Sequence, residues 1–183
     1  MIGGPGSGKT TLARRLAARL GVPPTDLDEI AYAGAKRSLD ARLVDVHALA
    51  ERPSWITEGI YLWWVDDLLQ SADTIVWLDV PWRVAAWRIV VRHMRASVAG
   101  TNRHPGVRRL VRFLGSTRRY YVDDSAHEAI ARDDDGAVTR ARTAVELAVY
   151  ADKLVRCSSP ADVAAFVNSI GDSTESALSS NSS

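Results

Sequence analysis

The sequence predicts an α/β fold with three layers, in which helices cover both faces of a parallel sheet. Three observations indicate this class. Short apolar segments with strand character alternate with helical segments along the chain. The run Ile75–Leu78 is continuously apolar, as expected for a strand that is buried on both faces. The glycine-rich run Gly3–Thr11 is followed at once by an amphipathic segment.

Apolar spacing and helix-breaking residues place the individual elements. Leu12, Leu16 and Leu20 share one face of a first helix at residues 10–20, which Gly21 and two following prolines end. Strands are expected at residues 25–27, 54–57, 73–80 and 153–157. Further helices are expected at residues 38–51, 61–69, 81–95, 107–121, 139–150 and 160–170. Residues 1–170 are predicted to form one domain, with loops at 97–105 and over most of 123–136, and the Ser-rich residues 171–183 to be a disordered tail.

The glycine-rich run satisfies G-x-x-x-x-G-K-[ST], the pattern of a phosphate-binding loop. Its glycines allow successive backbone N–H groups to turn toward an anion, and the helix that follows points its positive end at the same place. Lys9 is placed to reach the β- and γ-phosphates, and the Thr10 hydroxyl to bind Mg²⁺. The predicted nucleotide contacts in the loop are Gly3, Gly4, Pro5, Gly6, Ser7, Gly8, Lys9, Thr10 and Thr11.

Carboxylates follow two of the predicted strands. Asp28 comes just after the strand at 25–27, and Glu58 just after the strand at 54–57. Ligands of parallel sheets sit at the carboxyl ends of the strands, so both acids are expected near Lys9. Glu58 suits the shell of a metal ion, whereas Asp28 suits an acceptor hydroxyl. Asp79 is expected to cap the helix that follows it.

Arginines are concentrated in one window. Ten of the 20 arginines lie between Arg83 and Arg119, and no Asp or Glu occurs among them. Arg88, Arg92 and Arg95 share one helical face, where they repel one another unless an anion lies between them, and a triphosphate is such an anion. A solvated basic face is the alternative. Four tryptophans are expected in the core or in the wall of an acceptor pocket: Trp63, Trp64, Trp82 and Trp87.

Composition excludes some classes of protein. The formal net charge is +1, so overall charge indicates no particular partner. Cys157 is the one cysteine, which excludes an internal disulfide and a cysteine-rich zinc site. The sequence contains no apolar run of about 18 residues and no signal peptide, so we predict a soluble cytoplasmic protein with no membrane partner.

Several motifs together resemble those of a known family. The loop Gly3–Thr11, the run Trp55–Gly59, the run Leu78–Pro81 and the run Arg88–Arg92 occur in the order found in adenylate kinase-like P-loop kinases. The segments Asp26–Asp28, Trp55–Tyr61 and Trp77–Arg92 more closely resemble the bacterial topology modulation proteins, a related group.

This resemblance implies a five-stranded parallel sheet of order 2-3-1-4-5 and an arginine-rich lid at about residues 96–136. It implies that Glu58 is the acid after the third strand and that Arg88 and Arg92 contact the nucleotide. Arg132, Asp134 and Arg142 loosely match a second lid signature, for which Arg140 is an equal candidate. The chain departs from the family at Val91, where a glycine is usual, and at Asp28-Glu29, which replaces the Thr-Gly pair that recognises AMP. Acids there suit a hydroxyl acceptor better than a phosphate.

We therefore expect a monomeric ATP-binding kinase that transfers the γ-phosphoryl group of Mg·ATP to a small-molecule acceptor, either a nucleotide or a hydroxyl metabolite. The expected catalytic residues are Lys9, Asp28, Glu58 and Arg92, and Thr10 is the expected metal ligand. A regulatory ATPase without a dedicated acceptor and a nucleic-acid-binding protein are the alternatives. Met1 and Ile2 alone precede the loop, so the first strand is expected to be truncated and the natural start to lie upstream.

Overall fold

The computed structural model describes residues 1–102, 105–126 and 135–180, with residues 137 and 171–180 described by their backbone alone. Its strands form two small parallel sheets. In one, β1 (Pro24–Asp26) pairs with β2 (Ile56–Glu58), and Asp26 lies opposite Glu58. In the other, β3 (Ile75–Leu78) pairs with β4 (Leu154–Cys157). The fold is therefore α/β with parallel strand pairing, as predicted.

The predicted five-stranded sheet is not formed, because the segment before the glycine-rich loop is too short for a strand. Ile2 forms only isolated parallel bridges, to Gly59 after β2 and to Trp77 in β3. Its N–H donates to the Val76 carbonyl (2.8 Å), and its own carbonyl accepts from the Leu78 N–H (2.8 Å). Ile2 therefore lies between the two small sheets, in the place that the predicted order gives to the first strand.

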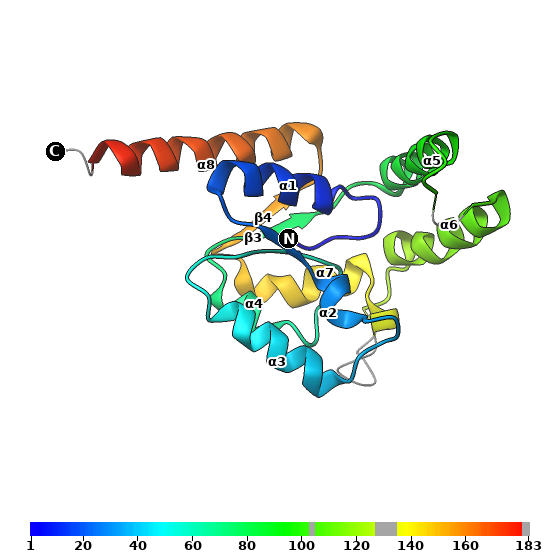
Figure 1. Ribbon diagram of the computed structural model, residues 1–183, viewed down its shortest axis with the longest axis horizontal. Helices are drawn as coiled ribbons and strands as arrows, with labels where there is room; N and C mark the ends of the chain where they lie inside the picture. The colour runs from blue at the N-terminus through cyan, green and yellow to red at the C-terminus, as the bar shows by residue number, and fades with distance from the viewer. Residues whose placement is uncertain (103–104, 127–134, 181–183) are drawn as a thin grey trace.

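Helices lie on both sides of the strands (Figure 1). On one side, α1 (Lys9–Leu20) and α8 (Pro160–Ser180) pack together. On the other lie α2 (Leu27–Ala31), α3 (Leu39–Ala50), α4 (Asp66–Ser71), α7 (Arg140–Leu147) and the short 3₁₀ turns Asp135–Ala137 and Ala148–Tyr150. At one end of the molecule α5 (Trp82–Val98) and α6 (Val107–Val122) contact each other and project from the body.

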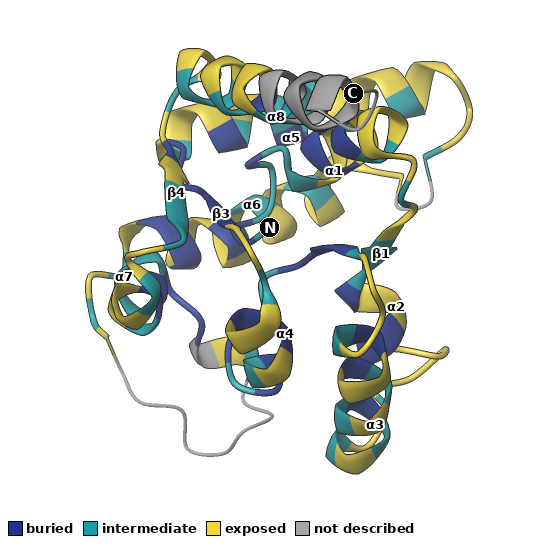
Figure 2. Ribbon diagram, turned by 90° about the vertical axis from the view of Figure 1, so that its left-hand side faces the viewer, coloured by how far each residue is buried: buried dark blue, intermediate teal, exposed yellow. Residues whose placement is uncertain are grey.

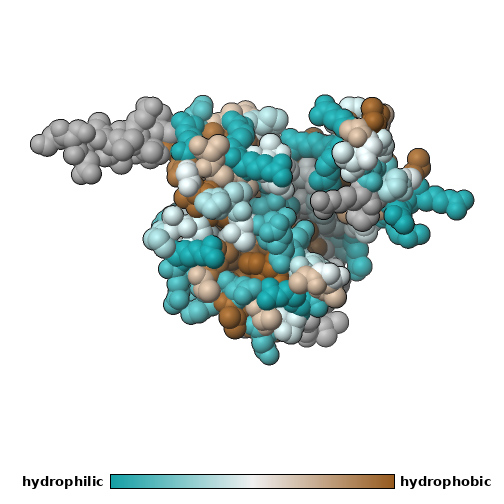
Figure 3. All heavy atoms as spheres, viewed as in Figure 1, coloured by the Kyte–Doolittle hydropathy of each residue, from teal (hydrophilic) through white to brown (hydrophobic). Residues whose placement is uncertain are grey.

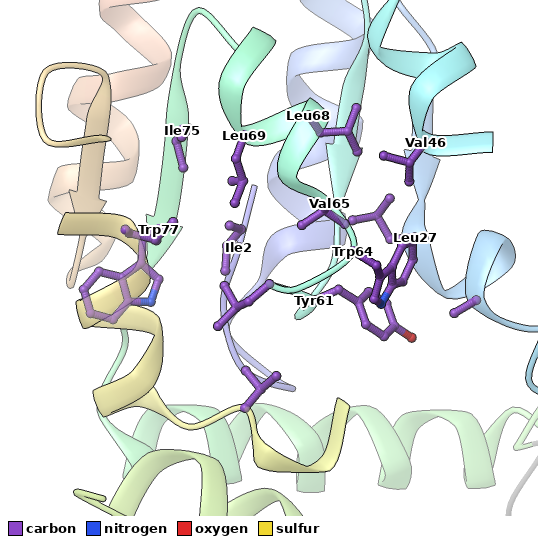
Figure 4. Close-up of a cluster of buried hydrophobic side chains, with 14 of the residues drawn as sticks. Ile2, Leu27, Val46, Tyr61, Trp64, Val65, Leu68, Leu69, Ile75 and Trp77 are labelled. Atoms are coloured by element: carbon purple, nitrogen blue, oxygen red, sulfur yellow. The ribbon is translucent and has the colours of Figure 1, made fainter. Parts of the chain in front are cut away.

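The side chains of β3 divide between two cores because alternate residues of a strand point to opposite faces. Val76 and Leu78 pack with Leu12 and Leu16 of α1. Ile75 and Trp77 join the larger core on the other side (Figure 4), which also contains Trp64. All four β3 residues are buried, whereas the outer face of α3 is largely exposed (Figure 2).

Several element boundaries differ from the sequence prediction. β1 ends at Asp26, one residue earlier than predicted, because the Asp26 carboxylate accepts from the Asp28 N–H and starts α2 there. Residues 61–65 are not helical: they are almost wholly apolar and sink into the core, so α4 begins only where two acidic residues follow them. The backbone of α8 continues past Ile170 to Ser180, so that part of the predicted tail is helical.

No helix in the described part of the chain combines the length and the apolar character that crossing a membrane requires.

Candidate functional site

The glycine-rich loop packs so closely against its surroundings that side chains are excluded from several positions. Gly6 has φ +80°, and a Cβ there would lie 2.7 Å from the Ala85 carbonyl of α5. A Cβ on Gly4 would lie 2.4 Å from the ring of Tyr120 in α6. Gly8 has φ +104° and forms the N-cap of α1 without any side-chain cap. The glycines are therefore needed for the path of the loop as well as for its open N–H groups.

Lys9 folds its side chain back over the loop. Its Nζ donates to the Gly3 carbonyl (2.8 Å) and to the Gly4 carbonyl (3.3 Å). Burial lowers the pKa of this ammonium from its usual value of 10.5, although Glu58 and Asp28 act in the opposite direction. The first turn of α1 contains no acidic residue. An ammonium and a helix N-terminus thus lie together with no carboxylate in that turn to neutralise them.

Two side chains from the projecting helices donate hydrogen bonds to backbone carbonyls of the loop. Arg88 of α5 donates from a guanidinium nitrogen to the Ser7 carbonyl (2.6 Å). Tyr121 of α6 donates its hydroxyl to the Pro5 carbonyl (2.9 Å), and burial raises its pKa. Arg88 was expected near the phosphates from its place in the arginine window. Tyr121 was not, because one tyrosine in a basic helix carries no recognisable signal.

The two strand-end acids lie beside the loop in different surroundings. Glu58 is buried at the end of β2, where it accepts a hydrogen bond from the Thr10 hydroxyl (2.5 Å). Asp28 is exposed in the first turn of α2 and accepts from the Tyr61 hydroxyl (2.7 Å). Burial and this hydrogen bond raise the pKa of Tyr61, so it remains a donor at neutral pH.

A cleft of about 800 Å³ joins these groups. It is lined by several of the candidate site residues named from the sequence: Asp28, Glu58, Arg88, Arg92 and residues 5–11 of the loop. Gly3 and Gly4, the first two residues of the loop, do not line the cleft. Gly3 lies against Leu78 instead, and Gly4 against Tyr120. Asp26, a further acid of the Asp26–Asp28 motif, lines the cleft as well, and lining residues that sequence reasoning did not find include Arg15, Ile60, Phe113, Pro160 and Val163. They come from distant segments and match no motif.

Asp79 takes a different role from the predicted helix cap. Its buried carboxylate accepts from Arg140 (2.5 and 3.0 Å) and from Arg156 (2.9 and 2.5 Å). The residue at the N-cap of α5 is instead Pro81. Arg140 is thereby engaged away from the cleft, and Arg142 pairs with Glu146. Arg132 and Asp134 of the loose lid signature lie outside the described residues, so the lid at 96–136 stays a prediction.

The chemistry of the cleft fits a nucleotide polyphosphate and a hard cation. Lys9, Arg88 and Arg92 with the start of α1 supply positive charge, and Thr10 with Glu58 supplies oxygen ligands of the type that Mg²⁺ prefers. Within the described residues, no cluster of three or more His, Cys, Asp or Glu side chains could hold a metal by itself. A cation that takes part of its ligands from phosphates needs no such cluster.

Comparisons with known proteins find only distant structural likeness. No protein-family model matches the sequence, and no curated protein matches it. A gluconokinase from Sinorhizobium meliloti 1021 superposes with a TM-score of 0.43 at 16% identity, over 94% of each chain. A sugar kinase from Janibacter sp. HTCC2649 gives 0.37 at 18% identity, over 76% of this chain and 96% of that one. Neither likeness is strong enough to say what this chain acts on, so its resemblance to adenylate kinase-like and topology modulation proteins rests on motifs alone.

Proposed function

We propose that this chain is a P-loop kinase that transfers the γ-phosphoryl group of Mg·ATP to a hydroxyl-bearing small molecule. One observation carries the proposal: a single cleft brings Lys9, Thr10, Glu58 and Asp28 together. Phosphoryl transfer needs an anion cradle, a metal site and a group that handles the proton of the acceptor. The first three of these residues supply the cradle and the metal site, and Asp28 supplies the proton acceptor.

The residues of the loop would bind and neutralise the triphosphate. Backbone N–H groups at the start of α1 would face it, Lys9 lies beside them, and Arg88 and Arg92 line the same cleft. When bound between Thr10 and the phosphates, Mg²⁺ would offset the charge that develops on the β- and γ-oxygens. Glu58 holds the Thr10 hydroxyl and would orient the water ligands of the ion.

The acceptor would lie beside Asp28. In the transfer, an acceptor oxygen forms a bond to the γ-phosphorus while the bond to the β–γ bridging oxygen breaks, and Asp28 takes the hydroxyl proton. Tyr61 keeps the Asp28 carboxylate in place through its hydrogen bond. Asp26 lines the same part of the cleft. Two carboxylates repel a phosphate group on the acceptor, so we favour a hydroxyl metabolite over a nucleoside monophosphate.

Transfer of γ-³²P from labelled ATP to panels of polyols, nucleosides and nucleoside monophosphates tests the proposal, with free phosphate measured in parallel. We expect a labelled product with one class of neutral hydroxyl compound. In Lys9→Ala, turnover should be abolished, a fall of at least about 10²-fold, because a charged transition-state contact is lost. Lys153→Ala is the matched control, because the Lys153 ammonium lies outside the cleft, where it donates to the Gln70 carbonyl and lies over the Tyr150 ring.

Three results would count against this function. Phosphate release that is independent of every acceptor would favour the regulatory ATPase instead. Tight duplex DNA binding that persists at about 0.15 M salt and competes with ATP would favour a nucleic-acid-binding protein. Unchanged turnover in Lys9→Ala would remove the basis of all nucleotide-dependent proposals.

A further inference from the structure

The outer face of α5 carries a continuous stripe of apolar side chains that no part of the described chain covers. Trp87 is 68% exposed, Met94 58% and Val98 91%, and Val84 at the start of the helix is 36% exposed. Val91 lies between them and is partly buried. The opposite face of the same helix is buried through Ala85 and Ile89, which pack against Gly6 of the loop. Packing against the loop therefore explains the apolar residues on one face of α5, but it does not explain the apolar stripe on the outer face.

The spacing of the stripe is that of a helix-packing seam. Its members follow one another by three, four, three and four residues: Val84, Trp87, Val91, Met94 and Val98. These are the a and d positions of a heptad repeat, which insert between the side chains of a facing helix. A helix lying in a membrane surface carries a broader apolar face, whereas a stripe confined to a and d is the narrower seam of a coiled coil.

The charges beside the stripe indicate what kind of helix would bind to it. Arg83 and Arg95 border it at heptad positions g and e, are exposed, and form no ion pair among the residues that the structure describes. No acidic residue occurs anywhere from Arg83 to Arg119. In a pair of α5 helices from two copies, arginines would therefore face arginines or uncharged side chains. A helix with Glu or Asp at its e and g positions would pair with them instead.

We propose that the outer face of α5 is a docking seam for an acidic amphipathic helix of a partner protein. The apolar stripe takes the a and d side chains of that helix, and Arg83 and Arg95 pair with its carboxylates. Figure 3 shows hydrophobic residues among hydrophilic ones on the projecting α5 and α6 part of the surface. None of the five stripe residues lines the cleft, so a partner helix on the stripe would leave the cleft open.

A pair of designed peptides tests this seam with the full chain. Both peptides have three heptads with Leu at a and d; one has Glu at e and g, and its twin has Lys. In fluorescence anisotropy we expect the Glu peptide to bind with one-to-one saturation and the Lys peptide to bind at least about tenfold more weakly. The substitution Met94→Asp should weaken binding of the Glu peptide at least about tenfold. Val149→Asp, at a 77% exposed valine in another element, should leave its binding unchanged.

Thermal unfolding followed by circular dichroism confirms that both variants are folded before binding is compared. Equal binding of the two peptides, no binding of the Glu peptide, or wild-type binding by Met94→Asp would overturn the proposal. A dimer in sedimentation analysis that Met94→Asp dissociates would assign the seam to a second copy and likewise overturn it. So would binding to anionic phosphatidylserine vesicles, lost in Met94→Asp, in the absence of binding to the Glu peptide.

Discussion

The Thr10 hydroxyl donates a hydrogen bond to Glu58 and so joins the glycine-rich loop to the end of β2. The two residues are far apart in the sequence, and each was expected at a metal site for a separate reason. Their contact gives the loop threonine a defined orientation and leaves the buried carboxylate beside Lys9. Their shared position is the basis for the first prediction.

Replacing Glu58 by glutamine should lower catalysis without unfolding the protein. The amide keeps the size of the side chain and a hydrogen-bond acceptor for Thr10, but it removes the charge that would orient the metal. We expect activity to fall roughly 10–100-fold and the Mg²⁺ concentration for half-maximal rate to rise. Glu51→Gln is the control, since Glu51 is exposed and lies outside the cleft. A rate and Mg²⁺ dependence like those of the wild type would show that Glu58 plays no part at the metal.

Replacing Gly6 by alanine should damage the loop more than the same change at Gly34. Both glycines have φ +80°, so each variant carries the cost of a left-handed alanine, roughly 1–2 kcal/mol. Only at Gly6 does the new methyl group also meet a carbonyl, that of Ala85 at 2.7 Å, which adds about 1–3 kcal/mol of overpacking. Urea unfolding should show Gly6→Ala as the less stable variant, and titration with a fluorescent ATP analogue should show weaker binding for it alone. Equal stability of the two variants would contradict the close packing of α5 on the loop.

Removing the Tyr61 hydroxyl should affect turnover more than nucleotide binding. In Tyr61→Phe, the Asp28 carboxylate loses the hydrogen bond that it accepts from the Tyr61 hydroxyl, which is worth about 1.5 kcal/mol. The kcat should therefore fall roughly tenfold while the KM for ATP stays the same. Tyr150→Phe is the control, at a tyrosine outside the cleft. The kcat of Asp28→Asn should fall further, by about 10²–10⁴-fold, because this substitution removes the proton acceptor itself. If Tyr61→Phe raised the KM for ATP instead, Tyr61 would be acting on the nucleotide side.

Asp79 should make the protein sensitive to acid. Burial alone would raise the pKa of its carboxyl group, but hydrogen bonds and charge from Arg140 and Arg156 outweigh burial and hold the pKa below its usual 3.8. A depressed folded-state pKa gives stability that is complete above the unfolded value and is lost as the pH falls through the folded one. Asp79→Asn should therefore cost about 1–3 kcal/mol at pH 7, a range kept low because both arginines are about half exposed.

The measurement is urea unfolding of wild type and Asp79→Asn between pH 7 and pH 3. The difference in free energy of unfolding should shrink as the pH falls below about 4, because the Asp79 carboxyl of the unfolded chain takes up a proton there while the folded one is still ionised. Asp152→Asn, at an exposed acid, should differ little from wild type throughout. A constant difference for Asp79→Asn across this range would mean that its ion pairs do not carry the effect.

Residues that belong to sequence motifs could be predicted as candidate site residues. Residues that only form part of the wall of the cleft could not. Glu58 was found because an acid just after an apolar strand is a local pattern. Phe113 and Val163, which complete the wall of the cleft, carry no such pattern. Trp87 shows the reverse error: its size suggested the core or a pocket wall, yet it lies exposed on α5 outside the cleft. Burial depends on which helix face meets the body, and hydrophobicity alone does not contain that information.

The α/β class, most of the helices and strands, and the glycine-rich loop with the helix that follows it could be predicted from the sequence alone. Local rules decide these features: glycine dihedrals, alternating apolar spacing and the lysine that follows the loop. Only the tertiary structure decided that Ile2 bridges two separate sheets, that Asp79 pairs with Arg140 and Arg156, and that Glu58 meets Thr10. These contacts join segments that are distant along the chain, and they exist because packing of the two cores brings those segments together.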